Sequence, residues 1–298
     1  MFRPLLNTLR YILTHPLNRK QKIAAMQRFV AWQLASRMLP GAAVVPFANG
    51  TRLIVTSGMT GATGNIYCGL HEFEEMAFTL HALRAGDLFL DIGANIGAFS
   101  ILAASRGASV LGFEPAPETF TRLLDNVHIN RFESLIDCRN QALGSEAGKL
   151  RFTVQLDSIN HVATPEDKGE VIEVPLVSLD SLALPLEGRH VLLKIDVEGF
   201  ELPVLRGATK LLQHPGVLAV IMEVNGSGTR YGFSDEAVHE FMTALKFAPY
   251  RYTPFAREIR PASSDDEASG NVIYIRNREV VAQRIETAPN IAVQGAAF

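Results

Sequence analysis

The sequence is poor in cysteine, contains no long apolar run and has no acidic residue before position 72. Its two cysteines, Cys68 and Cys138, are too few for a disulfide framework or a metal cluster, and we expect each to be an inert buried thiol. An apolar run of about 18 residues, which a membrane-spanning helix needs, is absent, as is the apolar core of a secretory signal. These absences predict a cytoplasmic protein without a membrane-spanning helix.

The first 71 residues carry a net charge of +8, which leaves −11 for the remainder and −3 for the whole chain. The basic residues of this segment are Arg3, Arg10, Arg19, Lys20, Lys22, Arg28, Arg37 and Arg52. Apolar residues such as Leu5, Leu9 and Leu13 lie between the first charges, a pattern found in helices that bind anionic membrane surfaces. The alternative, which we favour, is a helical extension that packs on the main domain and turns a basic side to solvent.

With 298 residues and 47% hydrophobic content, the chain is long enough for one large α/β domain with additions. Periodicity predicts helices over 4–14 and 21–39, then a β-hairpin over 44–55 with a tight turn at Asn49-Gly50. A glycine-rich, polar stretch from residue 61 leads into a helix over 72–83. Further on, we predict a helix over 202–212, closing strands over 250–253 and 271–275 around an exposed loop at 263–269, and a frayed end of about fifteen residues.

The stretch from Phe89 to Gly97 reads as a buried strand that runs into a glycine-punctuated turn and then a helix. Such a turn points backbone N–H groups and the positive end of a helix at a ligand. A dinucleotide-binding turn would need glycine where Asn95 stands, so that the backbone can approach a pyrophosphate. The next strand ends in Glu114, roughly 20 residues on, where a carboxylate is expected to hold a ribose diol. Together these features argue for a nucleoside without phosphates.

Three motifs in order resemble the FkbM-type family of S-adenosylmethionine-dependent methyltransferases: Asp-Ile-Gly-Ala-Asn-Ile-Gly (91–97), Gly-Phe-Glu-Pro (112–115) and Leu-Lys-Ile-Asp-Val-Glu-Gly-Phe-Glu (193–201). The similarity covers about residues 65 to 225. It implies a Rossmann-like class I methyltransferase fold, with a mostly parallel, doubly wound, seven-stranded sheet and here an N-terminal helical and hairpin cap. We accordingly divide the chain into an extension (1–60), a methyltransferase domain (61–280) and a C-terminal tail (281–298).

The resemblance also implies S-adenosyl-L-methionine as the cofactor, with its methionine end at the first motif and its ribose at the second. The residues expected to bind it there are Asp91, Gly93, Asn95, Gly97 and Glu114. The loop after a third strand over 135–138 should wall the adenine, with Asn140 and Ala142 as candidates. Glu72 has two interpretations. It is either a residue at a helix start whose negative charge interacts favourably with the helix dipole, or a residue that lines the cofactor or acceptor pocket.

Methyl transfer from a sulfonium is an in-line displacement, so the acceptor oxygen must be placed close to the methyl carbon with a base in reach. The strand over 191–196 contains Lys194 and Asp196 near its end, and Glu198 follows it. The alternation of side chains along an extended chain places all three on one side. Asp196 is the first choice for base or acceptor-binding residue, with Lys194 beside it. The structural alternative is a buried ion pair of Lys194 with Asp196 or Glu201. His161, in a hairpin over 148–177 that reaches over the pocket, is the alternative base because imidazole titrates near working pH.

We therefore expect an O-methyltransferase that acts on a hydroxyl of a glycan, glycolipid or related metabolite, with no nucleic-acid partner. The acceptor is a small molecule, a glycan or a lipid-linked compound, and membrane contact, if any, is peripheral and uses the basic segment. Two other classes share the pattern: a nicotinamide-dependent oxidoreductase, against which Asn95 counts, and a non-catalytic membrane-surface protein that retains the fold. Asp196, Glu198 and Glu223 are a plausible oxygen-ligand set for magnesium. The resemblance requires no metal, so none is predicted.

Overall fold

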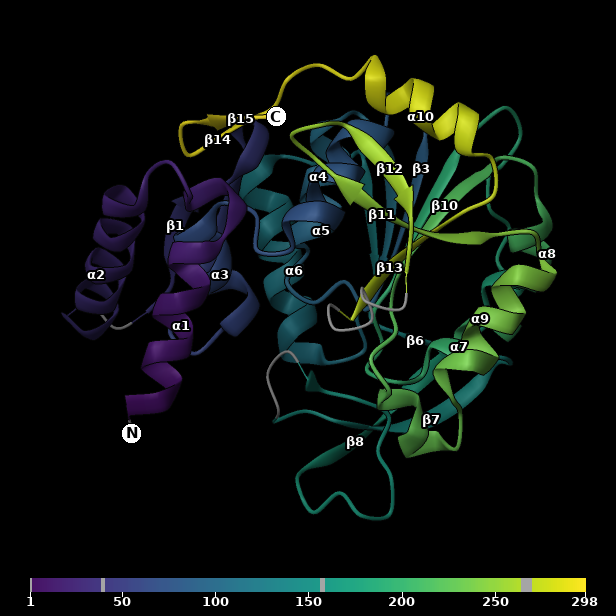
Figure 1. The fold of residues 1–298 in the computed structure, drawn as a ribbon. Helices are drawn as coiled ribbons and strands as arrows, with labels where there is room; N and C mark the ends of the chain where they lie inside the picture. The colour runs from purple at the N-terminus through teal and green to yellow at the C-terminus, as the bar shows by residue number, and fades with distance from the viewer. Residues whose placement is uncertain (1, 39–40, 156–158, 264–269) are drawn as a thin grey trace.

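The computed structural model describes residues 2–38, 41–155, 159–263 and 270–298. Its centre is an eight-stranded sheet whose strands are, in spatial order, β12 (Glu258–Pro261), β11 (Ala248–Thr253), β13 (Asn271–Ile275), β10 (Val217–Glu223), β9 (Val191–Ile195), β3 (Leu88–Ile92), β4 (Ser109–Phe113) and β5 (Ile136–Arg139). The five strands from β10 to β5 run parallel, whereas β13 is antiparallel to both β10 and β11. The mostly parallel, doubly wound sheet of the Rossmann-like methyltransferase class is thus confirmed (Figure 1).

The sheet has one strand more than the seven expected. The additional strand is β12, which pairs with β11 at the sheet edge across a turn that holds Arg257 at a φ of 55°. Its sequence, Glu-Ile-Arg-Pro, has a single buried residue, Ile259. So short a segment offers too few residues for an alternating pattern to be distinguished from a loop.

Helices cover both faces of the sheet (Figure 1). One face carries α4 (Phe73–Ala82), α5 (Ala98–Ser105), α6 (Pro117–Asn130) and α10 (Arg278–Glu286), and the other carries α7 (Glu201–Arg206), α8 (Thr209–Gln213) and α9 (Asp235–Ala244). Phe89 packs in the first core and Leu90 in the second, as side-chain alternation along a strand requires. The helix predicted over 202–212 is divided at Gly207, where a Cβ would lie 1.9 Å from the Gly144 carbonyl oxygen.

The N-terminal extension contains α1 (Phe2–Thr14), η1 (Pro16–Asn18), α2 (Lys22–Met38), β1 (Ala43–Pro46), η2 (Ala48–Gly50) and β2 (Arg52–Val55), and α3 (Thr60–Cys68) follows it. Both predicted helices and the antiparallel hairpin are confirmed, although a 3₁₀ turn replaces the tight turn. The glycine-rich, polar stretch from residue 61, for which no helix was predicted, forms α3. Gly64 in this helix is a packing glycine, because a Cβ there would lie 2.4 Å from His71 Nδ1. Within the described ranges, no helix is long and apolar enough to cross a bilayer.

A three-stranded sheet lies beyond the carboxyl ends of the central strands (Figure 1). It is formed by β6 (Ala142–Leu143), β7 (Gly148–Thr153) and β8 (Val171–Val177), with β8 in the middle. The antiparallel pairing of β7 with β8 confirms the predicted hairpin. Residues 156–158 of this hairpin lie outside the described residues, as does nearly all of the loop predicted at 263–269.

The prediction of a frayed C-terminal end is wrong. After α10 the chain forms a small hairpin of β14 (Ala292–Val293) and β15 (Ala296–Ala297). Ile291, Val293 and Phe298 are buried, and the Phe298 ring meets Phe73 edge-on at 5.1 Å between centroids. These apolar side chains are widely spaced in a polar sequence, so their shared burial against the start of α4 follows only from the fold.

We expect Phe298→Ala to lower the free energy of unfolding by about 2–4 kcal/mol, because it removes a buried aromatic ring from the core. Denaturant unfolding followed by circular dichroism measures this. Val44→Ala is the control, since Val44 is 56% exposed and should change stability by about 0.5 kcal/mol at most. An unchanged denaturant midpoint for Phe298→Ala would contradict the packed C-terminal hairpin.

Candidate active site

A cavity of about 400 Å³ opens at the carboxyl ends of β3, β4 and β9, within the range of small-molecule sites. The predicted residues that line it are Glu72, Gly93, Asn95, Glu114, Ala142, Lys194 and Asp196. The other predicted residues, all within the described ranges, lie outside this lining: Asp91, Gly97, Asn140 and His161. The fold therefore gathers residues from four distant stretches of the chain around one space.

The turn after β3 is held by hydrogen bonds to the end of the neighbouring strand β4. The N–H groups of Gly93 and Ala94 both donate to the Phe113 carbonyl, at 3.0 and 2.9 Å. The Asn95 N–H donates to Glu114 Oε2 at 2.9 Å, and Asn95 has a φ of 52°. The expectation that these amides point at a ligand is therefore wrong, because the end of β4 already takes them.

Gly93 is required by a close backbone approach. Its φ is 77°, and a Cβ at this position would lie 1.9 Å from the carbonyl oxygen of Asp196. The loops after β3 and β9 thus touch backbone to backbone. Gly97 serves packing in a similar way, since a Cβ there would lie 2.3 Å from Leu123 Cδ1.

Asp91 is fully buried beneath the turn and does not reach the cavity. Its Oδ2 accepts a hydrogen bond from Ser100 Oγ at 2.6 Å, while its Oδ1 has no hydrogen-bond partner among the described residues. Burial raises the pKa of this carboxyl, and the nearby Lys194 ammonium opposes that rise. Asp91 thus ties β3 to the first turn of α5.

Glu114 combines burial with a position in the cavity wall. Its two oxygens accept from the Ala116 and Asn95 N–H groups, both at 2.9 Å. Burial raises the pKa of this carboxyl to about 7, although the two N–H groups pull it down. A carboxylate offers about four acceptor positions, so about two remain for a ligand.

The loop after β5 reaches the same cavity with Gln141, Ala142 and Leu143. Asn140 instead turns back, and its Nδ2 donates to the carbonyls of Glu114 and Pro115 at 2.8 and 3.0 Å. Ala142 is therefore placed as predicted, whereas Asn140 supports the loop that carries Glu114.

Lys194 is the centre of a buried charge cluster. Its Nζ lies 2.7 Å from Asp196 Oδ2 and 4.9 Å from the centroid of the Phe99 ring. Asp91 lies opposite Lys194 in the register of β3 and β9. Burial alone would lower the pKa of Lys194, but the carboxylates of Asp196, Glu72 and Asp91 raise it. The predicted ion pair between Lys194 and Asp196 is therefore present, and it lies in the cavity wall.

Glu72 belongs to this cluster and accepts from Asn271 Nδ2 at 3.3 Å. Burial raises its pKa, and Lys194 acts against that rise. Its position matches both interpretations, since Glu72 is the residue directly before α4 and also lines the cavity together with Asn271. Asn271 carried no sequence signal, because it is the first residue of a strand far along the chain.

A second acidic group adjoins Asp196. Carboxylate oxygens of Asp196, Glu198 and Glu223 all lie within 4.8 Å of one another, so the fold brings together the three acids considered above as metal ligands. Glu198 has a φ of 54°, which is uncommon for a residue other than glycine. Burial, then Asp196 and Glu198, raise the pKa of Glu223 to about 8.

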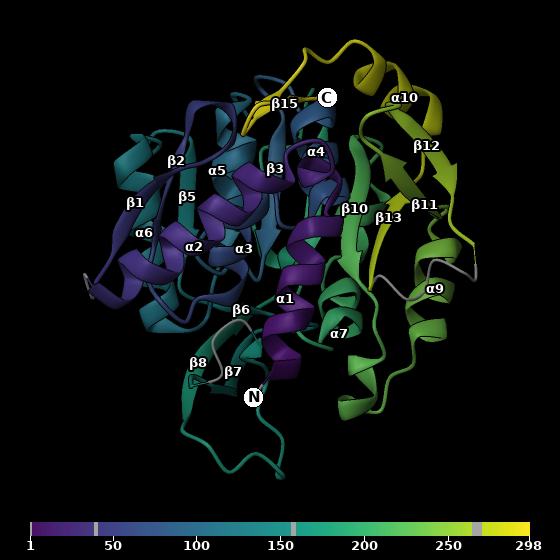
Figure 2. The same cartoon turned by 60° about the vertical axis from the view of Figure 1, so that its left-hand side comes forward.

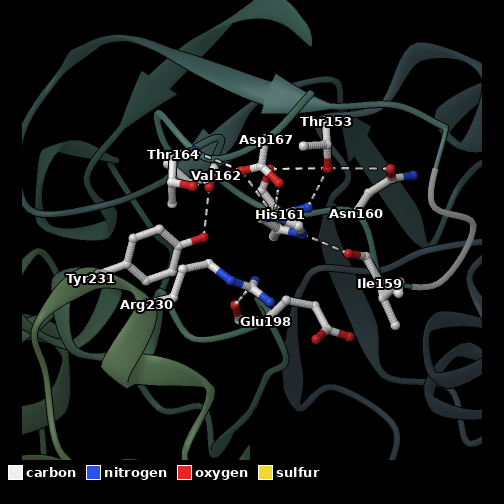
Figure 3. Close-up of polar contacts among 10 residues, drawn as sticks. All are labelled: Thr153, Ile159, Asn160, His161, Val162, Thr164, Asp167, Glu198, Arg230 and Tyr231. Atoms are coloured by element: carbon white, nitrogen blue, oxygen red, sulfur yellow. Dashed lines mark hydrogen bonds and ion pairs between the residues drawn. The ribbon is translucent and has the colours of Figure 1, made fainter. Parts of the chain in front are cut away.

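His161 lies in the β7–β8 hairpin and is not among the residues that line the cavity. Figure 3 shows its polar contacts. Its Nδ1 is 2.8 Å from the Ile159 carbonyl, and its Nε2 is 3.2 Å from Asp167 Oδ1. Both ring nitrogens thus already have an oxygen partner within the protein. This environment does not fit the role of alternative base.

A doubly wound sheet with a strand-end acid after β4 and charged residues after β9, all facing one cavity, defines the class I methyltransferase architecture. Residues 91–252 match the model of the methyltransferase FkbM domain, more than half of the chain. The protein therefore belongs to the FkbM methyltransferase family.

Two relatives illustrate the family. The hexuronic acid methyltransferase AglP of Haloferax volcanii is 30% identical over 155 residues, covering 52% of this chain and 62% of the relative. The 31-O-demethyl-FK506 methyltransferase FkbM of Streptomyces tacrolimicus is 32% identical over 189 residues, covering 51% and 72%. Among solved structures, methyltransferase FkbM from Methylobacillus flagellatus KT has a TM-score of 0.44 at 16% identity, covering 85% of this chain and 60% of that one.

We expect Lys194→Met to lower the free energy of unfolding by about 2–4 kcal/mol at pH 8, because it leaves buried carboxylates without a counter-charge. When the pKa of a carboxyl is higher in the folded than in the unfolded state, the free energy of unfolding of the protein falls as the pH rises through the folded pKa. The pKa values of Glu72 and Asp91 are already raised, and loss of the ammonium raises them further. The deficit should therefore be smaller at pH 5 than at pH 8, as measured by denaturant unfolding at both.

Lys149→Met is the matched control, because Lys149 pairs with Glu173 at 2.6 Å while both side chains are well exposed. Exposed pairs contribute little, so this variant should unfold like the parent at both pH values. Equal deficits for the two lysine variants would contradict the buried cluster.

Proposed function

We propose that this protein is an S-adenosyl-L-methionine-dependent methyltransferase that methylates a hydroxyl group of a glycan, glycolipid or related metabolite. The observation that carries the proposal is that one cavity is lined both by Glu114, a strand-end acceptor for a ribose diol, and by Asp196, a carboxylate beside a buried ammonium. Family membership supports the reaction class, and the names of two relatives support the acceptor class.

The residues present fit this cofactor. Glu114 has acceptor positions left for a diol, and Gln141, Ala142 and Leu143 line the same cavity, where an adenine could lie against the side chains of Ala142 and Leu143. The amides of Gly93, Ala94 and Asn95 are all engaged, so the turn has few donors for the pyrophosphate of a nicotinamide cofactor. When bound, S-adenosyl-L-methionine supplies an electrophilic methyl group on a sulfonium.

The acceptor side of the proposal rests on Asp196. Its side chain is 32% exposed and lines the cavity, and the Lys194 ammonium at 2.7 Å orients the carboxylate. In the proposed reaction Asp196 accepts a hydrogen bond from the acceptor hydroxyl, fixes its direction and takes its proton as the oxygen attacks. Lys194 keeps the carboxylate in place and does not itself contact the acceptor.

Calorimetry with S-adenosylmethionine and S-adenosylhomocysteine tests the cofactor half, with NADH titrated in parallel. Binding of the first two and not of NADH is expected. No heat of binding with millimolar S-adenosylhomocysteine would sink the proposal. Mass spectrometry of surface glycans and metabolites from cells with and without the gene then tests the acceptor half through a shift of one methyl mass.

We expect Glu114→Gln to weaken the binding of S-adenosylhomocysteine by roughly 10- to 100-fold, the scale of a lost hydrogen bond to a charged group. Glu118→Gln is the control, because Glu118 is exposed near the start of α6 and outside this cavity. Calorimetry gives both dissociation constants. A change below about twofold for Glu114→Gln would make the ribose assignment wrong.

The same carboxyl predicts a pH dependence. Burial raises the pKa of Glu114 to about 7, so the side chain is mainly an ionised, hydrogen-bond-accepting carboxylate above that pH and mainly protonated below it. Affinity for S-adenosylhomocysteine should therefore fall between pH 8 and pH 6 in the parent protein. Glu114→Gln has no proton to gain, so its weaker affinity should vary little over this range.

Asp196→Asn should keep the fold and leave cofactor affinity nearly unchanged, but lower turnover per folded molecule by roughly 10²–10⁴-fold, as expected for a lost general base. Turnover is followed as S-adenosylhomocysteine formed with hexuronic-acid-containing oligosaccharides. The companion variant His161→Gln should retain turnover, because His161 faces Asp167. If Asp196→Asn melted several degrees lower with intact activity per folded molecule, Asp196 would be a structural ion-pair residue only.

A further inference from the structure

Helix α2 is apolar on two opposite sides. Phe29 and Trp32 are buried in the main core, where Phe29 meets the Tyr67 ring of α3 at 5.3 Å between centroids. The other side carries Ile23, Val30, Leu34 and Met38, which are 79%, 48%, 58% and 76% exposed. These four recur at intervals of seven, four and four residues, so they form one stripe along the helix. The favoured expectation, a packed extension, accounts for the first side and leaves the second unexplained.

The neighbouring helix α1 also carries exposed apolar side chains. Its Leu5 and Leu6 are 46% and 60% exposed. The two helices contact each other and lie on the near side of the molecule in Figure 2. Six of the nine large hydrophobic side chains exposed in the described residues belong to α1 and α2. Such clustering marks an interaction site, since single exposed apolar residues are ordinarily scattered.

The charges that α1, α2 and the turn between them carry have one sign. The exposed basic side chains on these helices and in the turn between them are Arg10, Arg19, Lys20, Lys22 and Arg37. None of them forms an ion pair with another described residue. No acidic residue occurs before Glu72 to oppose them. Lys22 and Arg37 stand at the two ends of α2, so they flank the stripe.

We propose that this face of α1 and α2, the apolar stripe with its basic flanks, docks on the surface of an anionic lipid bilayer. Two contributions stabilise a helix at a bilayer surface. Its apolar side chains enter the headgroup boundary, and its basic residues are attracted to anionic lipid headgroups. The exposed side of a helix can lie along the plane of a bilayer. It offers no groove in which a peptide partner could dock. The proposal goes beyond the methyl-transfer chemistry and does not depend on it.

The test is flotation of the full chain with vesicles of phosphatidylglycerol and phosphatidylcholine, compared with vesicles of phosphatidylcholine alone. We expect binding to the anionic vesicles at low salt and weaker binding at high salt, since screening removes the charge contribution. The double variant Ile23→Gln, Leu34→Gln should lower the partition coefficient about tenfold or more. The double variant Lys22→Gln, Arg37→Gln should lower it on anionic vesicles only.

Phe255→Gln is the matched control, because Phe255 is 53% exposed but belongs to neither helix. It should bind vesicles like the parent. Thermal melting and S-adenosylhomocysteine affinity should be unchanged in both double variants, so a failure of the proposed chemistry would be seen separately from a failure of docking.

Three results would overturn the proposal. The first is no binding to anionic vesicles at low salt. The second is an equal loss of binding in Phe255→Gln and in the apolar double variant. The third is a parent dimer that the apolar double variant converts to a monomer, in which case the face is an interface between two copies of the chain.

Discussion

The buried ammonium of Lys194 is the interaction on which the site depends. A charge this far from water is stable only when carboxylates compensate it, and here they come from separate parts of the chain: Glu72 before α4, Asp91 on β3 and Asp196 after β9. The register that sets Asp91 opposite Lys194 is a property of the sheet. The charge of Lys194 therefore links three parts of the fold: the pairing of β3 with β9, the start of α4 and the cavity wall.

Backbone contacts set the position of the loops around this charge. Gly93 lies against the Asp196 carbonyl, which leaves no room for a Cβ, and Asn95 donates its N–H to Glu114. The ends of β3, β4 and β9 thus hold one another in place before any ligand arrives. Pre-organisation of this kind suits a reaction whose main requirement is placement of two reactants.

The N-terminal extension is joined to the same site. Tyr11 on α1 has its hydroxyl 2.7 Å from Nδ1 of His71, which lines the cavity, and burial lowers the pKa of that histidine. Arg28 on α2 bonds to the Tyr67 carbonyl of α3, a helix that also contributes to the wall. The extension therefore braces the cavity with its inner side, while its outer side presents the apolar stripe and basic residues.

The sequence alone determined the order of the strands and helices around β3, β4 and β9, because buried parallel strands leave long apolar runs that end in charge or glycine. It also identified Glu114, Lys194 and Asp196, since strand ends in such a sheet converge on one edge. It could not determine which way a side chain or amide turns beyond that edge. Asn140 and His161 face protein partners, and the amides after β3 bond to β4. Those choices, like the burial of Phe298 and the arrival of Asn271 beside Glu72, arise from contacts between residues far apart in the chain, which only the tertiary structure brings together.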